Sequence, residues 1–212
     1  MTAASSNANP PHGSGGRRGP GRPRSPEADT AILDAALELF LERGIEGMSM
    51  EQVAKRAGVA KLTLYRRWRS KERLVAQAME RMRRPVPDVP VDEIRRTGLA
   101  RFVERSLDAQ VEVLTRPGFR AMIARLLGSS VHYPELLATS WGEHVEPRRR
   151  ATYALLEHAK QAGMIPEDTD NEVLIDMMVG AILYRLLQPD PLDSERLRSY
   201  LEAVYRQAGL LA

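Results

Sequence analysis

Apolar residues recur three or four positions apart along most of the chain, which is the spacing of one face of an α-helix. A clear run begins at Leu99 and ends at Leu114, before Pro117. From Val91 onward, no segment shows convincing alternation of apolar and polar residues with hairpin turns, the pattern typical of β-strands. The pattern therefore predicts an all-α fold.

Four more helices are expected in the C-terminal part, at about 119–127, 134–162, 171–188 and 194–207. Pro147 either kinks the second of these or begins a new helix there, because proline cannot donate a backbone hydrogen bond. Residues 171–188 are apolar on nearly every side, which predicts burial on more than one face. The last helix carries a single apolar stripe, formed by Leu197, Tyr200, Leu201 and Val204.

The N-terminal part contains a helix that begins at Ser25, with Pro26 at its first position, and ends at Gly44. Phe40 on this helix is expected to be core. Another helix starts at Ser70 and leads toward prolines 85, 87 and 90, which stiffen a connection. We therefore divide the chain into a disordered basic arm (1–26), a three-helix domain (27–84) and a larger helical domain (85–212).

Between these two helices, residues 49–73 predict two short helices joined by a tight turn. Ser49 and Gln52 form a capping box, Met48 and Val53 a hydrophobic staple, and Gly58 follows the first helix where a left-handed residue is needed. Leu64 and Trp68 lie four residues apart on the second helix. This is the geometry of a helix-turn-helix, whose second helix enters the major groove of DNA. We therefore expect residues 27–84 to be a DNA-binding domain.

Charge supports this interpretation. Residues 49–73 contain eight Lys or Arg against two Glu, a net charge of +6. Residues 1–84 carry a net +7 and residues 85–212 a net −4, although the whole chain is only +3. A basic front half and an acidic back half fit one domain that contacts phosphate and another that does not.

The segment AGVAKLTLYRRWRSKERL resembles the signature A-G-V-S-x-x-T-L-Y-x-Y-F-x-S-K-x-x-L of the tetracycline-repressor (TetR) family, and the resemblance covers roughly residues 28–82. Ala60 replaces the usual Ser, Trp68 the usual Phe, and Leu62 is bulkier than usual; these departures bear on which operator is bound. The resemblance implies a homodimeric regulator, most simply a repressor, that binds a palindromic operator and is released by a small molecule.

The resemblance also implies roles for individual residues. The recognition-helix residues that face DNA would be Lys61, Leu62, Thr63, Tyr65 and Arg66. Ser49 and Lys71 would bind backbone phosphates, and both also lie at helix N-termini, which favour anions. The last two helices would form a four-helix bundle with a second copy, and the two-sided apolar character of residues 171–188 independently suggests such a contact.

The arm carries Arg17, Arg18, Arg22 and Arg24 without a nearby acid. Gly21-Arg22-Pro23 resembles the core of an AT-hook, so Arg22 and Arg24 are candidate contacts to the minor groove. The alternative is a tail that only aids solubility. Its composition, with hardly any side chain large enough to pack, predicts disorder.

The apolar residues Phe102, Met122, Trp141, Met177 and Tyr184 are candidates to line an effector cavity between helices, although each is also explained as ordinary core. The expectation of a pocket rests on the resemblance. An alternative is a DNA-binding architectural protein without an effector, discriminated by heat-stability shifts across a panel of metabolites.

Nothing in the sequence indicates an enzyme, although an enzyme with a fused DNA anchor is a second alternative. His144 and His158 are too far apart along a continuous helix to share a metal, and no catalytic motif occurs. No cysteine is present, so neither a thiolate metal site nor a disulfide is expected, and we expect no cofactor. No apolar run reaches the length of a membrane span, and no signal peptide is recognisable. We therefore expect a cytoplasmic protein with no membrane partner.

Overall fold

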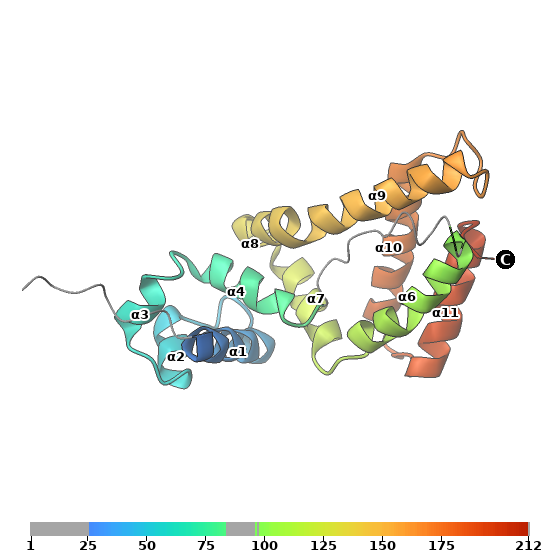
Figure 1. The fold of residues 1–212 in the computed structure, drawn as a ribbon. Helices are drawn as coiled ribbons and strands as arrows, with labels where there is room; N and C mark the ends of the chain where they lie inside the picture. Colours follow the sequence, from blue (N-terminus) through green and yellow to red (C-terminus); the bar gives the residue numbers. More distant parts are fainter. Residues whose placement is uncertain (1–25, 84–95, 97, 212) are drawn as a thin grey trace, which may run out of the picture.

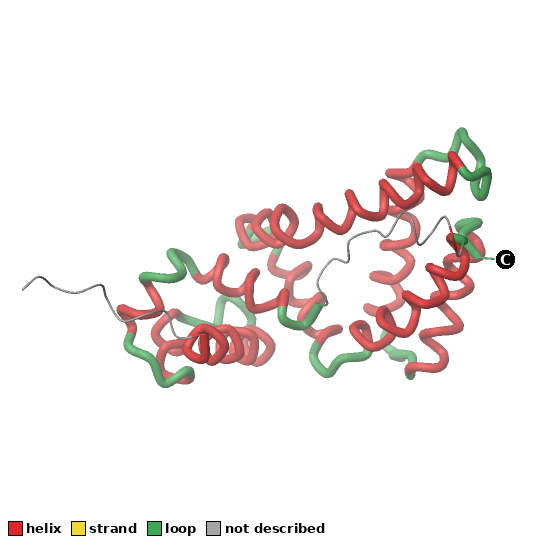
Figure 2. Tube along the Cα trace, viewed as in Figure 1, coloured by secondary structure: helices red, strands yellow, loops and turns green. Residues whose placement is uncertain are grey.

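The structure is a computed structural model that describes residues 26–83, 96 and 98–211. Among these residues it contains helices and loops but no strand, so the predicted all-α fold is confirmed (Figure 2). The arm, with Arg22 and Arg24, the cap at Ser25 and the prolines at 85, 87 and 90 lie outside the described residues.

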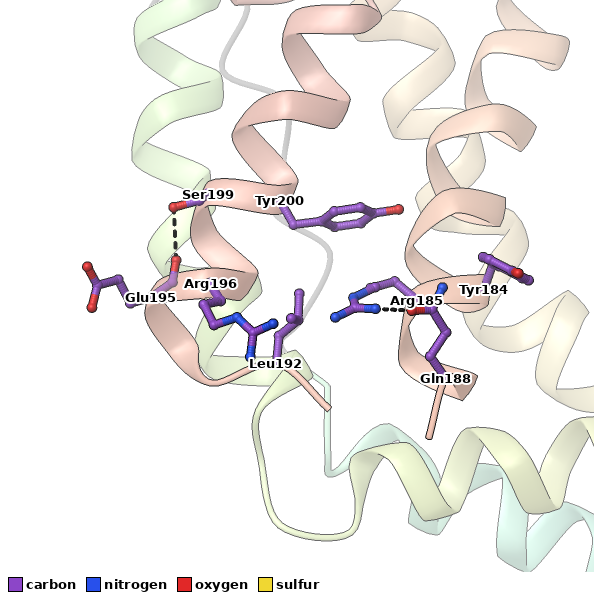
Figure 3. Close-up of a pocket in the computed structure, with 8 residues that line it drawn as sticks. All are labelled: Tyr184, Arg185, Gln188, Leu192, Glu195, Arg196, Ser199 and Tyr200. Atoms are coloured by element: carbon purple, nitrogen blue, oxygen red, sulfur yellow. Dashed lines mark hydrogen bonds between the residues drawn. The ribbon is translucent and has the colours of Figure 1, made fainter. Parts of the chain in front are cut away.

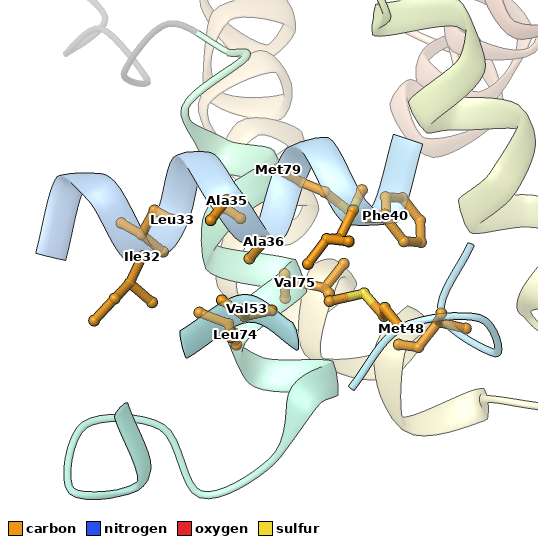
Figure 4. Packing of buried hydrophobic residues seen from close by; sticks show 14 of the residues in the cluster. Ile32, Leu33, Ala35, Ala36, Phe40, Met48, Val53, Leu74, Val75 and Met79 are labelled. Atoms are coloured by element: carbon orange, nitrogen blue, oxygen red, sulfur yellow. The ribbon is translucent and has the colours of Figure 1, made fainter. Parts of the chain in front are cut away.

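Four helices form the N-terminal end: α1 (Pro26–Arg43), α2 (Met50–Arg56), α3 (Lys61–Tyr65) and α4 (Lys71–Glu80). Their facing sides bury a common core in which Phe40, Val53, Leu64 and Leu74 are fully enclosed (Figure 4). Burial of this kind is the main stabilising contribution in a small helical unit. The prediction that Phe40 packs behind the helix-turn-helix is confirmed.

The local signals around α2 act as the sequence predicts. Gln52 N–H donates to the Ser49 hydroxyl at 3.2 Å, and Ser49 N–H donates to the Gln52 side chain at 2.9 Å, which completes the capping box. Met48 and Val53 are buried in the same core. Gly58 has φ = +67°, the left-handed conformation that ends α2 and turns the chain toward α3.

Helix α3 is shorter than predicted, and Trp68 lies beyond its end. Trp68 is nevertheless buried, and its indole Nε1–H donates to Gln77 Oε1 of α4 at 2.7 Å. A buried tryptophan needs such an acceptor for its N–H group. Trp68 is therefore part of the junction between α3 and α4, and its replacement of the usual Phe does not alter the exposed side of α3.

The apolar core of the N-terminal end continues into two later helices, α7 (Phe119–Ser129) and α8 (Pro134–Ser140). Met122, Leu126 and Leu136 are buried in the same cluster as the residues of α1 and α4. Gly118, at the start of α7, has φ = +85°, and a Cβ there would lie 2.9 Å from Leu41 Cδ1 of α1. In Figure 1, α7 accordingly lies between the N-terminal helices and the rest of the molecule.

Helix α8 continues through a π-helical segment, Trp141–Val145, into α9 (Glu146–Gln161). Pro147 lies in the first turn of α9. Because proline has no N–H and its ring would meet the carbonyl four residues earlier, the α-helical pattern cannot pass unchanged through this point. The N–H of Glu146 instead bonds to the carbonyl of Trp141, five residues back. The predicted stretch is therefore helical throughout residues 134–161, and its α-helical pattern resumes with α9 at Glu146, next to Pro147.

The remaining helices, α6 (Leu99–Leu114), α10 (Asn171–Leu187) and α11 (Ser194–Gln207), form the other end of the molecule with α9 (Figure 1). Two smaller apolar clusters hold them together, one around Leu156 and Ile175 and the other around Leu107 and Leu201. Asp170 and Asp193 cap α10 and α11 through their side chains.

Within the single chain that the structure describes, helix α10 is buried along one side. The sequence predicted burial on a second face as well, against a second copy, and that part stays a prediction. Ile175 and Met178 are buried, but Met177 is 66% exposed and Tyr184 is 71% exposed. Five exposed apolar residues of α10 recur three or four positions apart and form a stripe along one side of the helix, whereas the exposed Val179 lies off that side. The five are Val173, Met177, Gly180, Tyr184 and Leu187. We refer to these five residues as the α10 stripe.

Candidate nucleic-acid interface

Helix α3 presents most of its side chains to solvent. Leu64 is its buried anchor, whereas Lys61, Leu62, Tyr65 and Arg66 are exposed, and Leu62 is 70% exposed. An isolated leucine with this exposure cannot stabilise the fold, but its methyl groups suit contact with a thymine methyl in the major groove. Thr63 is half-buried, so it is less accessible than its neighbours among the predicted contacts.

The eight cations between Ser49 and Arg73 do not all remain available to DNA. Arg56 makes a bidentate contact with Glu42 of α1, at 2.7 and 3.0 Å, and Arg67 pairs with Asp29 of α1. These two arginines fasten the helix-turn-helix to α1. By contrast, four exposed cations form no ion pair with a described residue, and they are the ones best placed to meet phosphate: Lys55, Arg66, Arg69 and Arg73.

Lys61 is held by an acid that the sequence analysis did not single out. Glu51, in the first turn of α2, has its Oε1 at 2.5 Å from Lys61 Nζ and accepts a hydrogen bond from the Tyr65 hydroxyl at 3.0 Å. The Lys61 ammonium also lies 5.6 Å from the centroid of the Tyr65 ring. We refer to Glu51, Lys61 and Tyr65 as the Glu51 clamp.

The pKa values within the clamp shift as the geometry requires. The hydrogen bond from Lys61, with further hydrogen bonds from the backbone and Tyr65, lowers the pKa of Glu51 to about 2. The same contact with Glu51 raises the pKa of Lys61 and that of Tyr65. Glu51 therefore carries its negative charge, and Lys61 its positive charge, at neutral pH.

The two predicted phosphate contacts differ in how free they are. Ser49 accepts a bond from Gln52 N–H, and its hydroxyl hydrogen remains able to donate to an anion. Lys71 donates from Nζ to the Ile45 carbonyl at 2.8 Å and lies 5.0 Å from the centroid of the Tyr133 ring. In this conformation Lys71 ties the start of α4 to the turn between α1 and α2, so a phosphate would have to compete with that contact.

Polar contacts join α4 to the helices behind it. Arg148 of α9 donates to both carboxylate oxygens of Glu80 on α4, at 2.6 and 3.4 Å, and His144 Nδ1 lies 3.4 Å from Glu80 Oε2. Arg116 donates to the Met82 carbonyl just beyond the end of α4 at 3.2 Å. Burial lowers the pKa of the nearby Arg83, and the positive charge of Arg148 acts in the same direction.

The five predicted effector-site residues are not gathered around one cavity. Met122 is fully buried in the core shared by α1, α4 and α7, and Phe102 packs half-buried against the cluster around Leu156. Trp141 is 46% exposed, with the Arg149 guanidinium 5.8 Å from its ring centroid. The apolar periodicity that suggested these residues does not distinguish core, exposed face and cavity.

A surface cavity of about 660 Å³, wide open to solvent, lies between the end of α10 and the start of α11 (Figure 3). Of the five predicted residues, Tyr184 borders it. Tyr200 and Arg196 face it from α11, opposite Arg185 and Gln188 on the α10 side. Its volume is in the range typical of small-molecule sites. The Tyr200 hydroxyl donates to the Ala181 carbonyl at 3.1 Å and holds this ring against α10.

Residues missed by the sequence analysis are mainly acids and their long-range partners. Glu51 lies two residues after the capping Ser49, yet only the crossing of α2 and α3 brings it to Lys61. Glu80 and Arg148 are far apart in sequence and no local pattern connects them. Across the part of the chain that the structure describes, no cluster of potential metal ligands is present and no helix is long and apolar enough to cross a bilayer.

Both the N-terminal and the C-terminal part of the chain match models of known protein families. Residues 32–78 match the family model described as bacterial regulatory proteins, tetR family. Residues 99–204 match that of the tetracyclin repressor-like C-terminal domain. The chain is 35% identical to the HTH-type transcriptional regulator YdeS of Bacillus subtilis (strain 168), over 79% of this chain and 82% of that protein. It is 29% identical to the HTH-type transcriptional regulator AqdR of Rhodococcus erythropolis, over 71% of this chain and 70% of that protein.

Solved structures show the same arrangement. The crystal structure of the TetR family transcription regulator SCO0332 is 28% identical, covers 88% of this chain and 99% of its own, and superposes with a TM-score of 0.59. The Salmonella enterica protein GusR is 20% identical, covers 87% of this chain and 95% of its own, and has a TM-score of 0.65, a likeness of fold alone.

Proposed function

Because this chain belongs to the TetR family of DNA-binding transcriptional regulators, we propose that it is a repressor that binds a palindromic operator as a homodimer and leaves it when a small molecule binds. The observation that carries the proposal is the pairing of two exposed features at opposite ends of the molecule. One is the cationic face of α2, α3 and α4, and the other is the α10 stripe.

The α10 stripe supports the dimer. A contiguous apolar surface at one side of a helix is costly to leave in water and marks a surface for association. A second copy related by a twofold axis would bury the same residues on both subunits, as an isologous interface requires. The dimer would then present two α3 helices, so that operator half-sites are bound together or not at all.

In the proposed register, Leu62 and Lys61 reach base edges, whereas Arg66, Lys55 and the Ser49 hydroxyl meet phosphates. Lysine suits the O6 and N7 acceptors of guanine, and leucine suits a thymine methyl. Arg69 and Arg73 extend the cationic surface along the start of α4. Phosphate contacts fix the position of the protein on the duplex, and base contacts select the sequence.

We propose the cavity between α10 and α11 as the effector site. It combines two tyrosine rings, Tyr184 and Tyr200, with the cations Arg185 and Arg196, which favours a small aromatic molecule that carries an anionic group. Since Tyr184 also belongs to the α10 stripe, a ligand there would alter how the second copy packs. The resulting change in spacing between the two α3 helices would weaken operator binding, with a coupling of typically 1–3 kcal/mol.

The first test is selection of duplexes from a random-sequence library by the full chain, followed by titration of the enriched duplex with and without candidate ligands. The proposal expects an inverted repeat, a complex of two chains per site, and weaker DNA binding in the presence of at least one ligand. Enrichment of a sequence without twofold symmetry would contradict the dimer.

The second test separates effector binding from DNA binding. Ser199→Trp would add bulk to the α11 wall of the cavity and is expected to weaken the ligand response. The affinity for the enriched duplex should stay within about threefold, since α11 and α3 lie at opposite ends of the molecule (Figure 1). Glu202→Gln, elsewhere on α11, is the control. A ligand that binds equally well with and without DNA is not the effector. A panel that contains only such molecules would favour an effector-independent regulator.

A further inference from the structure

The Glu51 clamp lies on the DNA-facing side of the proposed register, where its acid is unexpected. Glu51 and Lys61 are both well exposed, with side-chain exposures of 50% and 59%. An exposed ion pair in water contributes little to folding, so stability alone does not account for it. The clamp also joins two of the side chains that recognition would use, Lys61 and Tyr65, to a single carboxylate.

A carboxylate on this surface affects different DNA contacts in different ways. Phosphate oxygens and the carboxylate are both negatively charged, so they repel each other. Neither carries a proton to donate, so no hydrogen bond forms between them. In the major groove, however, cytosine N4 and adenine N6 carry amino donors that a carboxylate can accept from. The position of Glu51 is therefore unfavourable beside phosphate and favourable beside these two bases.

We propose that Glu51 is a specificity-determining residue, which holds Lys61 and Tyr65 back from non-specific phosphate contacts and releases them when a base amino group takes their place. The inference rests on the DNA-binding register proposed above. On arbitrary DNA, release of Lys61 would leave the carboxylate facing phosphates without a donor. On the operator, a cytosine or adenine amino group donates to Glu51, and Lys61 becomes free to bind guanine.

The low pKa of Glu51 is consistent with this role, because the carboxylate stays ionised throughout the pH range in which DNA binding is measured. Lys61 is the charged group that faces it, and the neutral Tyr65 hydroxyl donates a hydrogen bond to it. Protonation does not open the clamp near neutral pH, so a competing donor must do so.

The test compares full-length Glu51→Gln with the unmodified chain and with Glu46→Gln as a matched control. Glu46 is an exposed acid in the turn before α2 that forms no ion pair with a described residue. Each protein is titrated against a random-sequence duplex and against the duplex that the unmodified chain enriches, over a series of salt concentrations. Circular dichroism checks that each variant retains its helix content.

Release of Lys61 by Glu51→Gln should add one phosphate contact on the random duplex, which steepens the dependence of log K on log salt by up to about 0.9. Affinity for that duplex at low salt should rise roughly three- to fivefold, the effect of removing one charge a few ångströms from a phosphate. Affinity for the enriched duplex should rise less, so the ratio of specific to non-specific binding falls. Glu51→Gln behaving like Glu46→Gln on the random duplex would overturn the proposal.

A double-variant cycle tests whether Glu51 acts through Lys61. In a Lys61→Met background, Glu51→Gln should no longer steepen the salt dependence, because the cation that it releases is absent. Steepening that persists would show that a different cation responds and would also overturn the proposal. If the unmodified chain enriches no sequence at all, the proposed operator function fails, whereas the random-duplex comparison still decides the role of Glu51.

Discussion

The two ends of the molecule differ in how completely a single chain buries their apolar side chains. At the N-terminal end, α1–α4 close a core around Phe40 and Leu74, and the side chains left exposed are mainly charged. At the other end, α6 and α9–α11 are joined by two smaller clusters, and α10 leaves an apolar stripe in solvent. The comparison teaches that the N-terminal end buries its apolar side chains within one chain, whereas α10 leaves apolar surface exposed that the proposed second copy would cover.

The largest effect on this comparison is expected from a substitution that prevents a second copy from packing on the α10 stripe. Met177→Arg places a charge in the middle of the α10 stripe and should convert the dimer to a monomer. Because a monomer meets the two half-sites independently, operator affinity should fall by roughly 10²- to 10⁴-fold. Sedimentation and duplex titration measure the two effects. Val131→Arg, at an exposed apolar residue outside the stripe, is the control, and a Met177→Arg protein that stays dimeric would refute the assigned interface.

The next change asks whether the two ends unfold together. Phe40→Ala should lower the free energy of unfolding by about 3–5 kcal/mol, the usual cost of deleting a buried phenyl ring. The chain's two tryptophans report on different regions, since Trp68 lies beside α4 and Trp141 in the π-helical segment. Because α7 and α8 share the core with α1 and α4, we expect fluorescence of either tryptophan to give the same midpoint.

Single-tryptophan versions, made with Trp68→Phe or Trp141→Phe, carry out that measurement in denaturant. A lower midpoint for Trp68 alone would mean that the shared core does not couple α1–α4 to the segment that leads from α8 into α9.

A smaller effect is expected where α4 meets α9. Glu80→Gln keeps the shape of the side chain but removes the negative charge beside Arg148 and His144, and should lower the free energy of unfolding by about 1–2 kcal/mol. Thermal unfolding measures this cost. Glu146→Gln, which breaks an exposed pair with Arg150, should cost at most a few tenths of a kcal/mol. Equal effects of the two variants would show that the α4–α9 contact is only a surface pair.

The smallest predicted change tests the N-caps of α2 and α3 at the N-terminal end. Ala60 has the extended backbone of an N-cap but no side chain to accept from α3, so Ala60→Ser should stabilise the chain by about 0.5–1 kcal/mol. Ser49→Ala removes an existing cap from α2 and should destabilise it by about 1 kcal/mol. Thermal unfolding of both variants is the measurement, and effects of the same sign would contradict the capping argument.

Features set by neighbouring residues could be predicted from the sequence, whereas contacts between distant helices could not. The α2 cap, the turn at Gly58 and the burial of Phe40 follow from signals within a few residues of each other, and the structure confirms them. The exposed cations Lys55 and Arg66 could not be separated from the paired Arg56 and Arg67 by sequence, because the pairing acids lie on α1. Long-range partners are set by how helices cross.

The effector-site candidates show the same limit. Met122 and Tyr184 are both large and apolar at helical spacing, yet one is fully buried and the other is exposed beside a cavity. Periodicity identifies the helix but not which neighbour covers each face. The proposed roles of Arg22 and Arg24 stay predictions, since both residues lie outside the described part of the chain.

The core that runs from α1 and α4 into α7 and α8 also limits how such regulators can be recombined. A graft that joined residues up to 83 to the C-terminal half of a relative would separate Phe40 and Met79 from Met122 and Leu136, with which they share one core. Mismatched volumes in a close-packed core cost stability even when every residue is apolar. A chimera that exchanges operator preference is therefore better built by transplanting the exposed residues of α2 and α3 than by exchanging the whole N-terminal end.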